Sequence, residues 1–289
     1  MSLGKHHLFT LYCLLLSCSK YLALPHLISR HDLVNFRQNN SCTSTSIPQF
    51  PECSPVSCDR VVVDGLFSLE DVEALRSIAT KGMATREEVG GPTILDLNTG
   101  YIRDSTGLEN LFYTRQGLFT AKEFEVYGAI IARLKAFVED SFATEVFFTA
   151  PTFITRLDGR QHWQPQGIHD EYWHTHADME STQHYHYSGL LYLSDYESDF
   201  TGGRLHILGE DRETVEQVVE PRRGRVVMFT SGWENPHFVE RLLGGQRFVL
   251  SFWFTCDKNK QFQIFLDGKA HISFSEKVGQ SISRQRGEL

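Results

Sequence analysis

Apolar residues recur at helical spacing in two stretches of the first half of the chain. Ser68 is placed to cap the first predicted helix, and Thr120 with Glu123 can form a capping box at the start of the second. The apolar face of the first helix would consist of Leu69, Val72, Leu75 and Ala79. The corresponding face of the second helix, over 120–142, would consist of Phe124, Tyr127, Ile130, Ile131, Leu134 and Val138. Both faces are expected to pack against a sheet.

From residue 150 the pattern changes to short runs of apolar and β-branched residues between turn signals. The turn signals are Gly202-Gly203, Pro221 and Gly244-Gly245. The predicted strands are Thr152–Leu157, His184–Leu193, Gly203–Leu208, Val215–Glu220, Arg225–Thr230, His237–Leu242 and Gln246–Thr255. Helices followed by about seven strands predict an α+β fold that is mainly β. In this fold the N-terminal helices would pack on one sheet of a β-sandwich or barrel.

The chain is predicted to hold one globular domain between terminal segments. The domain is expected over residues 58–260, with its β core at about 150–257, because the helical and strand patterns lie there. Residues 20–57 are rich in Ser, Asn, Thr and Pro without periodicity, which predicts a polar linker or stem. Residues 261–289 are interpreted as a C-terminal tail.

Residues 1–19 are predicted to be a secretory signal peptide or a short membrane anchor. The basic group Lys5-His6-His7 precedes an apolar run from Leu8 to Leu16. This run is shorter than the ~20 residues of a membrane-spanning helix, which favours cleavage after Ser19. An uncleaved segment would associate the protein with a membrane. The last four residues, Arg286–Leu289, resemble a degenerate signal for retrieval to the endoplasmic reticulum. Together these segments predict the lumen of the secretory pathway.

Composition and cysteine content agree with that interpretation. Hydrophobic residues at 41% and charged residues at 22% describe a chain that can build a core, which argues against a disordered chain and a many-pass membrane protein. A formal net charge of −8 argues against a nucleic-acid partner, since phosphate contacts need clustered Lys and Arg. Cys53 and Cys58 are candidates for a small disulfide loop in an oxidising lumen, and Asn39 opens a glycosylation sequon.

Three side chains from two distant segments form a candidate metal site. His176 and Asp178 lie two positions apart, so on an extended segment both would point to the same side. His237, at the start of a predicted strand, is the candidate third ligand. Two imidazoles and one carboxylate on one face leave three positions of an octahedral ion open, as in non-haem Fe(II) oxygenases. A tetrahedral zinc site is the alternative.

The strand predicted after His237 would place a charge inside the fold. Alternation puts four side chains on one face: Arg247, Val249, Ser251 and Trp253. The other face is apolar and consists of Phe248, Leu250, Phe252 and Phe254. An arginine facing a barrel interior is costly without an anionic partner, which a dicarboxylate cosubstrate would supply. Tyr192 could add a hydroxyl donor to the same carboxylate. A surface salt bridge of Arg247 is the alternative.

Two regions of the sequence resemble the Fe(II)- and 2-oxoglutarate-dependent dioxygenases of the prolyl-hydroxylase-like group. The first consists of His169–Asp178, Leu190–Leu193, Gly202-Gly203 and Val219–Pro221. The second, Ser231–His237 together with Gly245–Arg247, is also similar to the C-terminal domains of prolyl 3-hydroxylases. The resemblance is strongest between His169 and Asp257.

The resemblance implies a double-stranded β-helix (jelly-roll) core, with Fe(II), 2-oxoglutarate and ascorbate as cofactors or cosubstrates. The implied iron ligands are His176, Asp178 and His237. The implied contacts to the C5 carboxylate of 2-oxoglutarate are Arg247, Tyr192 and Ser251. It also implies dioxygen and a protein or peptide as substrates. Further candidates, for contacts behind the iron ligands or to substrate, are His174, His186 and Trp253.

Three functional classes follow from these observations. The first is a hydroxylase of protein or peptide side chains in the secretory pathway. The second is a zinc-binding, non-redox β-sandwich enzyme, which would have no use for Arg247 or Tyr192. The third is a non-catalytic lumenal binding module. A complete set of ligands together with Arg247 favours the first class.

Overall fold

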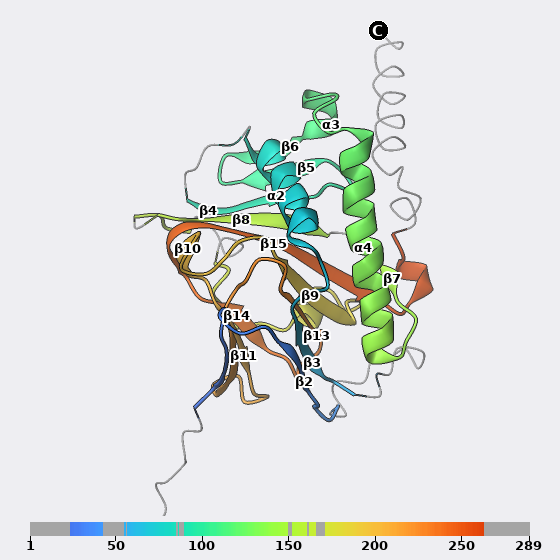
Figure 1. The fold of residues 1–289 in the computed structure, drawn as a ribbon, viewed down its shortest axis with the longest axis vertical. Helices are drawn as coiled ribbons and strands as arrows, with labels where there is room; N and C mark the ends of the chain where they lie inside the picture. Colours follow the sequence, from blue (N-terminus) through green and yellow to red (C-terminus); the bar gives the residue numbers. More distant parts are fainter. Residues whose placement is uncertain are drawn as a thin grey trace, which may run out of the picture.

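The computed structural model of the chain describes residues 24–42, 55, 57–84, 86, 90–149, 152–160, 162–165 and 171–262. The predicted signal segment, the predicted retrieval signal and Cys53 lie outside the described residues. Two sheets and two long helices make up the described part (Figure 1). No helix in these ranges is long and apolar enough to span a membrane.

The larger sheet has 11 strands, and nine of them form one continuous order. That order is β2 (Asn35–Gln38), β3 (Arg60–Val63), β13 (Val226–Thr230), β9 (Tyr187–Tyr192), β15 (Leu242–Thr255), β8 (Phe153–Gly159), β4 (Gly91–Leu95), β5 (Tyr101–Asp104) and β6 (Gly107–Asn110). Two short strands also pair with β15, namely β10 (Phe200–Gly202) and β7 (Phe147–Phe148). The long strand β15 is therefore the centre of the sheet.

The smaller sheet faces the middle of the larger one. Its order is β1 (His26–Ile28), β12 (Val215–Val219), β11 (Leu205–Leu208) and β14 (His237–Val239). An antiparallel bridge between His176 and His237 adds one more chain segment beside β14. Apolar side chains of both sheets form one buried cluster that includes Ile207, Val227 and Val249.

The chain passes back and forth between the two sheets. From β8 in the larger sheet the chain crosses to the His176 segment beside the smaller sheet and returns to the larger sheet as β9. It then forms β11 and β12 in the smaller sheet, β13 in the larger, β14 in the smaller and β15 in the larger. The antiparallel order β13-β9-β15-β8 thus faces β12-β11-β14 and the His176 segment. This arrangement is a double-stranded β-helix, a form of jelly roll. The predicted fold class is confirmed.

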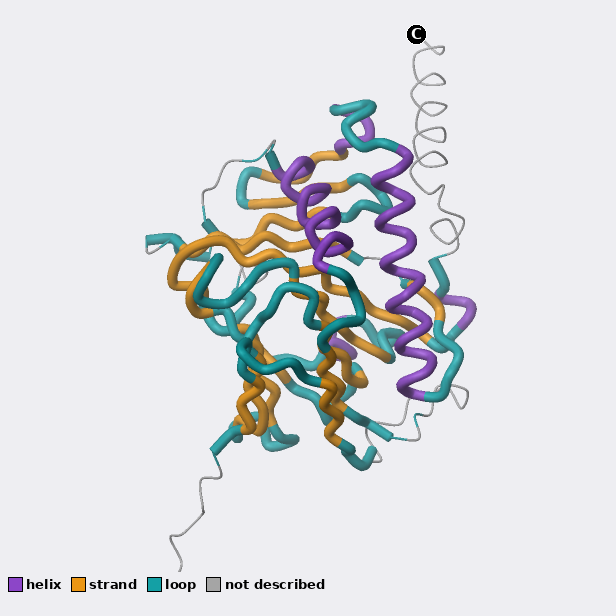
Figure 2. The backbone as a smooth tube through the Cα atoms, viewed as in Figure 1, coloured by secondary structure: helices purple, strands orange, loops and turns teal. Residues whose placement is uncertain are grey.

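Two helices cover the outer face of the larger sheet (Figure 2). They are α2 (Leu69–Met83) and α4 (Ala121–Phe142), and both begin with the predicted caps at Ser68 and Thr120. The predicted apolar face of α4 is buried, and it shares one core cluster with Phe248, Leu250, Phe252 and Phe254 of β15. Leu69 was wrongly assigned to the buried face of α2: it is 69% exposed, because it is the first residue of the helix.

Short helical turns complete the described elements. They are α3 (Leu111–Thr114), α5 (Asp178–Ser181) and the 3-10 helix η3 (Lys258–Lys260). Among them only α5 carries a predicted site residue, because it begins at Asp178.

The prediction of a linker over residues 20–57 was wrong for its first half. Strand β1 pairs in parallel with β12, and β2 pairs with β3 in antiparallel fashion. Ile28 is buried against the core between the sheets. Both strands lie at the edge of a sheet, so most of their side chains stay exposed or half-buried. Their sequence therefore carries little periodicity, which is why it resembled a linker.

The disulfide predicted between Cys53 and Cys58 was also wrong. Cys58 is bonded to Cys42 instead, with Cα atoms 5.0 Å apart. The pairing of β2 with β3 explains this partner, because it continues to a hydrogen bond from the Cys58 amide to the Asn40 carbonyl at 3.0 Å. That contact brings Cys42 beside Cys58. Cys256 also takes part in a disulfide.

Candidate metal and cosubstrate site

Three predicted ligands meet between the two sheets. His176, Asp178 and His237 each offer one ligand atom, and these atoms all lie within 4.8 Å of one another. The Asp178 carboxylate lies 3.7 Å from Nε2 of His176 and 3.8 Å from Nε2 of His237. The side chains are 28%, 13% and 9% exposed, in chain order. The group is therefore partly shielded from water yet open on one side.

Backbone pairing holds the two histidines together. The amide of His176 donates to the His237 carbonyl at 3.0 Å, and the amide of His237 donates in return at 2.9 Å. The expectation of a wholly extended segment from His176 to Asp178 was wrong in part. Ala177 is extended, but Asp178 starts the turn α5, because its carbonyl accepts from Thr182 and the next amide donates to Ser231. The carboxylate still reaches the histidines from this position.

Both histidine rings are oriented by their own backbone. Nδ1 of His176 lies 3.0 Å from the His174 carbonyl, and Nδ1 of His237 lies 3.0 Å from the Asn235 carbonyl. A carbonyl oxygen only accepts, so Nδ1 carries the proton in each ring and the lone pair lies on Nε2. Burial lowers the pKa of His237, which keeps this ring neutral. Each Nε2 is therefore available to a metal ion.

Arginine side chains brace the backbone behind each half of the ligand set. Arg212 contacts the Glu180 carboxylate. The same carboxylate accepts from the amide of Ala177 at 3.1 Å, and Ala177 lies between the first two ligands in the sequence. Arg60 donates to the side-chain oxygen of Asn235 at 2.7 Å, two residues before the third ligand. Sequence reasoning missed these contacts, since Arg60 is 175 positions away from its partner. Such contacts fix the orientation of metal ligands.

A cavity of about 250 Å³ opens beside the three ligands. Its lining includes all three, together with Arg247, Ser251 and Trp253 of β15. The predicted alternation of β15 is confirmed, because its apolar residues lie on the helix side of the sheet and these three face the cavity.

Arg247 has no anionic partner among the described residues, although it is only 2% exposed. Two other arginines are equally buried, and each has a carboxylate: Arg60 lies 2.7 Å from Glu216, and Arg225 lies 2.8 Å from Asp64. The Nε and Nη2 atoms of Arg247 have no hydrogen-bond partner in the described ranges. Burial without a counter-ion lowers the pKa of this guanidinium. The predicted alternative, a surface salt bridge, is wrong.

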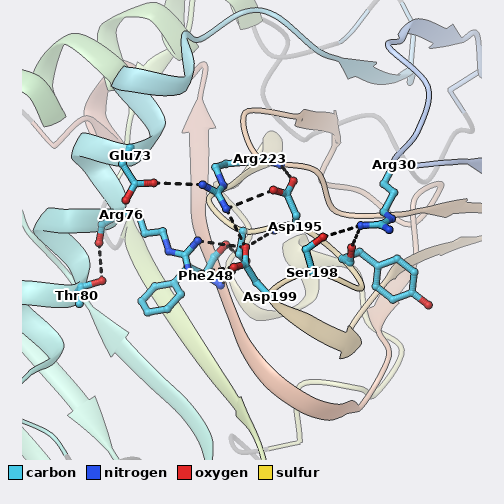
Figure 3. Close-up of polar contacts among 11 residues, drawn as sticks. Arg30, Glu73, Arg76, Thr80, Asp195, Ser198, Asp199, Arg223 and Phe248 are labelled. Atoms are coloured by element: carbon cyan, nitrogen blue, oxygen red, sulfur yellow. Dashed lines mark hydrogen bonds and ion pairs between the residues drawn. The ribbon is translucent and has the colours of Figure 1, made fainter.

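An ion-pair network outside the cavity holds the beginning of β15, which carries Arg247. Asp199 accepts from Arg76 of α2 and from Arg223, at 3.2 and 3.3 Å, as Figure 3 shows. The carbonyl of Asp199 accepts from the amide of Gln246 at 3.1 Å, directly before Arg247. Helix α2 is thereby tied to the strand that positions the buried guanidinium.

The other predicted site residues lie in different places. Tyr192 is fully buried on β9 beside Arg247, and it is not among the residues that line the cavity. His174 is exposed, with its ring 5.1 Å from the ring of His176. His186 lies away from the cavity lining, so a contact to substrate was a wrong prediction. Its Nδ1 instead accepts from the Cys256 amide at 3.1 Å.

The donor set suits a ferrous ion. Two neutral imidazoles and one carboxylate form an open group, and no fourth His, Cys, Asp or Glu joins it within the described residues. Structural zinc sites are closed by four protein ligands, which this group lacks. An open face beside an unpaired buried arginine is what a ferrous ion and a dicarboxylate cosubstrate require.

Residues 163–255 match the family model described as the 2OG-Fe(II) oxygenase superfamily. The rat protein named 2-oxoglutarate and iron-dependent oxygenase domain-containing protein 3 is 37% identical over 216 residues, which cover 72% of this chain and 67% of that protein. The chain belongs to the 2OG-Fe(II) oxygenase superfamily. This oxygenase is accordingly a 2-oxoglutarate-dependent dioxygenase, and the predicted family is confirmed.

Other relatives share smaller parts with this oxygenase. Rat prolyl 3-hydroxylase 2 is 28% identical over 216 residues, which cover 68% of this chain and 30% of that enzyme. Among solved structures, the likeness to a 2OG-Fe(II) oxygenase family protein from Burkholderia pseudomallei covers 70% of this chain and 87% of that protein. The sequence identity is 16% and the TM-score is 0.47.

Proposed function

We propose that this oxygenase hydroxylates a side chain of a protein or peptide in the secretory pathway. The observation that carries the proposal is the cavity that joins three open metal ligands to a buried arginine without an anionic partner. The substrate class is supported by the likeness to rat prolyl 3-hydroxylase 2.

The residues of the cavity would divide the work between them. His176, Asp178 and His237 would hold Fe(II), while Arg247 and Ser251 would bind the C5 carboxylate of 2-oxoglutarate. Iron and 2-oxoglutarate would supply the activation of dioxygen, with conversion of 2-oxoglutarate to succinate and carbon dioxide. Ascorbate would support turnover by keeping the iron reduced. The chain itself supplies orientation, a fixed positive charge and partial exclusion of water.

A zinc hydrolase and a non-catalytic module explain less of the structure. Hydrolysis on zinc needs an activated water and gives no reason to bury Arg247 without a counter-ion. A binding module has no need for open metal ligands. Leaving a buried charge unpaired costs several kcal/mol of folding free energy, so its retention points to a ligand that completes the pair.

The first experiment separates these classes by ligand binding. Purified protein is titrated with Fe(II) and 2-oxoglutarate without oxygen, and a weak visible charge-transfer band is expected. Asp178→Ala should lose the band, whereas Glu213→Ala, an exposed carboxylate in the turn before β12, should keep it. Zinc binding with no response to 2-oxoglutarate would instead establish the non-redox class. Succinate release against a library of lumenal peptides then identifies the substrate.

Two features of the chain support an oxidising compartment. Cys42 is bonded to Cys58, and disulfides persist mainly in secretory compartments. Asn39, the first residue of the sequon, is exposed directly after β2. Expression in secretory cells should therefore give a glycan of endoplasmic reticulum type that glycosidase removes. Asn39→Gln should abolish the mass shift, and a full-length protein without any glycan would contradict the proposed compartment.

A further inference from the structure

Tyr172 lies in the same cavity as Arg247 but comes from a different part of the chain. It precedes α5, on the connection that leaves β8, and it lines the cavity wall. Its hydroxyl oxygen accepts from the amide of Leu242 at 3.0 Å. Leu242 is the first residue of β15, the strand that also carries the guanidinium. The tyrosine is thereby fixed to the arginine's own strand.

The Tyr172 hydroxyl is bonded as an acceptor, which leaves its proton to donate. A phenol can donate one hydrogen bond and accept two, and the Leu242 amide uses one accepting position. Among the described residues, the bond from Leu242 is the one hydrogen bond found for this hydroxyl, and in it the hydroxyl oxygen accepts. The Nε and Nη2 atoms of Arg247 also lack partners there. The Tyr172 hydroxyl and the Arg247 guanidinium thus line one cavity with donor positions that the described residues leave open.

The ring of Tyr172 is held by neighbours outside the cavity. The next residue, Trp173, packs edge-on against it with ring centres 5.1 Å apart. The guanidinium of Arg241 lies over Trp173 at 4.9 Å and donates to the Trp163 carbonyl at 2.6 Å. These contacts position the hydroxyl before any ligand arrives, which is how a binding site avoids an ordering cost.

The charge state of Tyr172 also suits a donor. Burial raises the pKa of this phenol, and the nearby Arg247 and Arg241 guanidinium groups only partly oppose the shift. The hydroxyl therefore stays protonated at neutral pH. A neutral donor beside a buried cation matches a carboxylate, whose two oxygens accept from several donors at once.

We propose that Tyr172 donates its hydroxyl proton to the distal carboxylate of 2-oxoglutarate, as a further cosubstrate-binding residue beside Arg247. The inference rests on the proposed role of Arg247 in that same site. It assigns a binding function to a tyrosine that lies outside the predicted ligand set, on a segment four residues before His176. The carboxylate would then be held by residues of β15 and of the segment before α5.

The test compares two 2-oxo acids in the Fe(II)-loaded protein without oxygen. 2-Oxoglutarate carries the distal carboxylate, whereas 2-oxobutyrate keeps the metal-binding end and lacks that group. Tyr172→Phe removes only the hydroxyl and should weaken 2-oxoglutarate binding about tenfold, the value of a hydrogen bond to a charged group. It should leave 2-oxobutyrate binding unchanged. The visible charge-transfer band reports both affinities without turnover.

Tyr196→Phe is the matched control, because Tyr196 packs against the same apolar cluster as Tyr172 but does not line the cavity. It should bind both acids normally. An equal loss for both acids in Tyr172→Phe would overturn the proposal and assign the hydroxyl to fixing the Leu242 amide. Unchanged binding of 2-oxoglutarate would overturn it as well. Failure of the role of Arg247 is recognised separately, because Arg247→Ala would then bind 2-oxoglutarate normally.

Discussion

The guanidinium carbon of Arg247 lies 5.3 Å from the centre of the Tyr192 ring. The two residues come from the neighbouring strands β15 and β9, and both are buried in the fold. An aromatic ring stabilises a desolvated cation by about 2 kcal/mol, which is less than the cost of burying it. The ring therefore holds the guanidinium in place while leaving its charge available to an anion. The cavity is prepared for a carboxylate before one binds.

Replacing Arg247 by Ala should separate cosubstrate binding from metal binding. Removing one partner of a buried, hydrogen-bonded charge pair costs about 2–5 kcal/mol, so the affinity for 2-oxoglutarate should fall at least about 30-fold. Fe(II) affinity should change little, because the ligand set is intact. Anaerobic titrations measure both affinities. Arg247→Lys keeps the charge but not the bidentate contact and should bind with intermediate affinity. Equal loss of iron and 2-oxoglutarate would mean that the arginine is structural.

Gly203 should be intolerant of any side chain. Its φ is +69°, and an added Cβ would lie 2.3 Å from Leu242 Cδ1 and 3.1 Å from Arg247 Cδ. Gly203→Ala should therefore lower the melting temperature and weaken 2-oxoglutarate binding, because the stem of Arg247 must move. Gly65→Ala is the control, since Gly65 has a similar φ of +82° and nothing within 4 Å of its added Cβ. It should cost only about 1 kcal/mol of strain and leave ligand binding unchanged. Normal 2-oxoglutarate affinity in Gly203→Ala would show that the guanidinium adapts.

The bond between Cys42 and Cys58 should stabilise the edge of the larger sheet. It closes a loop with a sequence separation of 16, for which the loss of chain entropy in the unfolded state is worth about 3 kcal/mol. The double variant Cys42→Ser/Cys58→Ser should lose about that free energy of unfolding, as denaturant titration would measure. Adding a reductant should destabilise the parent protein more than this variant. Equal sensitivity of the two proteins to reductant would contradict the assignment.

His186 should make stability depend on pH in the mildly acidic range. Burial, aided by His184, lowers the pKa of His186 from 6.5 to about 4, so the folded protein keeps this ring neutral. As pH falls below 6.5, the unfolded chain takes up a proton that the folded chain does not, and stability declines. This contribution amounts to about 2 kcal/mol between pH 6.5 and 5, and the decline continues toward pH 4.

Urea unfolding at several pH values would measure this dependence. His186→Gln should flatten the curve between pH 6.5 and 5, where few carboxylates titrate. His184→Gln should keep most of it, because His184 is only half-buried. A curve that is unchanged in His186→Gln would assign the pH dependence to other groups.

The sequence correctly predicted those features that depend only on residues close together in the chain. Helix caps depend on residues three positions apart, so Ser68 and Thr120 could be assigned without any tertiary information. The two faces of β15 follow from alternation alone, and the structure places them as expected. Several strands outside the predicted set were missed because pairing, rather than periodicity, defines them. Strand β4, for example, begins with Gly91 and Pro92, which are ordinarily turn residues.

The sequence by itself predicted the β-rich fold class and the inward-facing charge of Arg247, because both follow from residue type and short-range alternation. The ligand set was predicted from the neighbouring pair His176 and Asp178, with His237 added as a candidate that the family resemblance supports. Only the tertiary structure decided that Cys58 pairs with Cys42, that His186 lies away from the cavity, and that Tyr172 lines the same cavity as Arg247. These relationships depend on which strands and connections lie side by side. Backbone pairing between distant segments sets that arrangement, and no local pattern of residues records it.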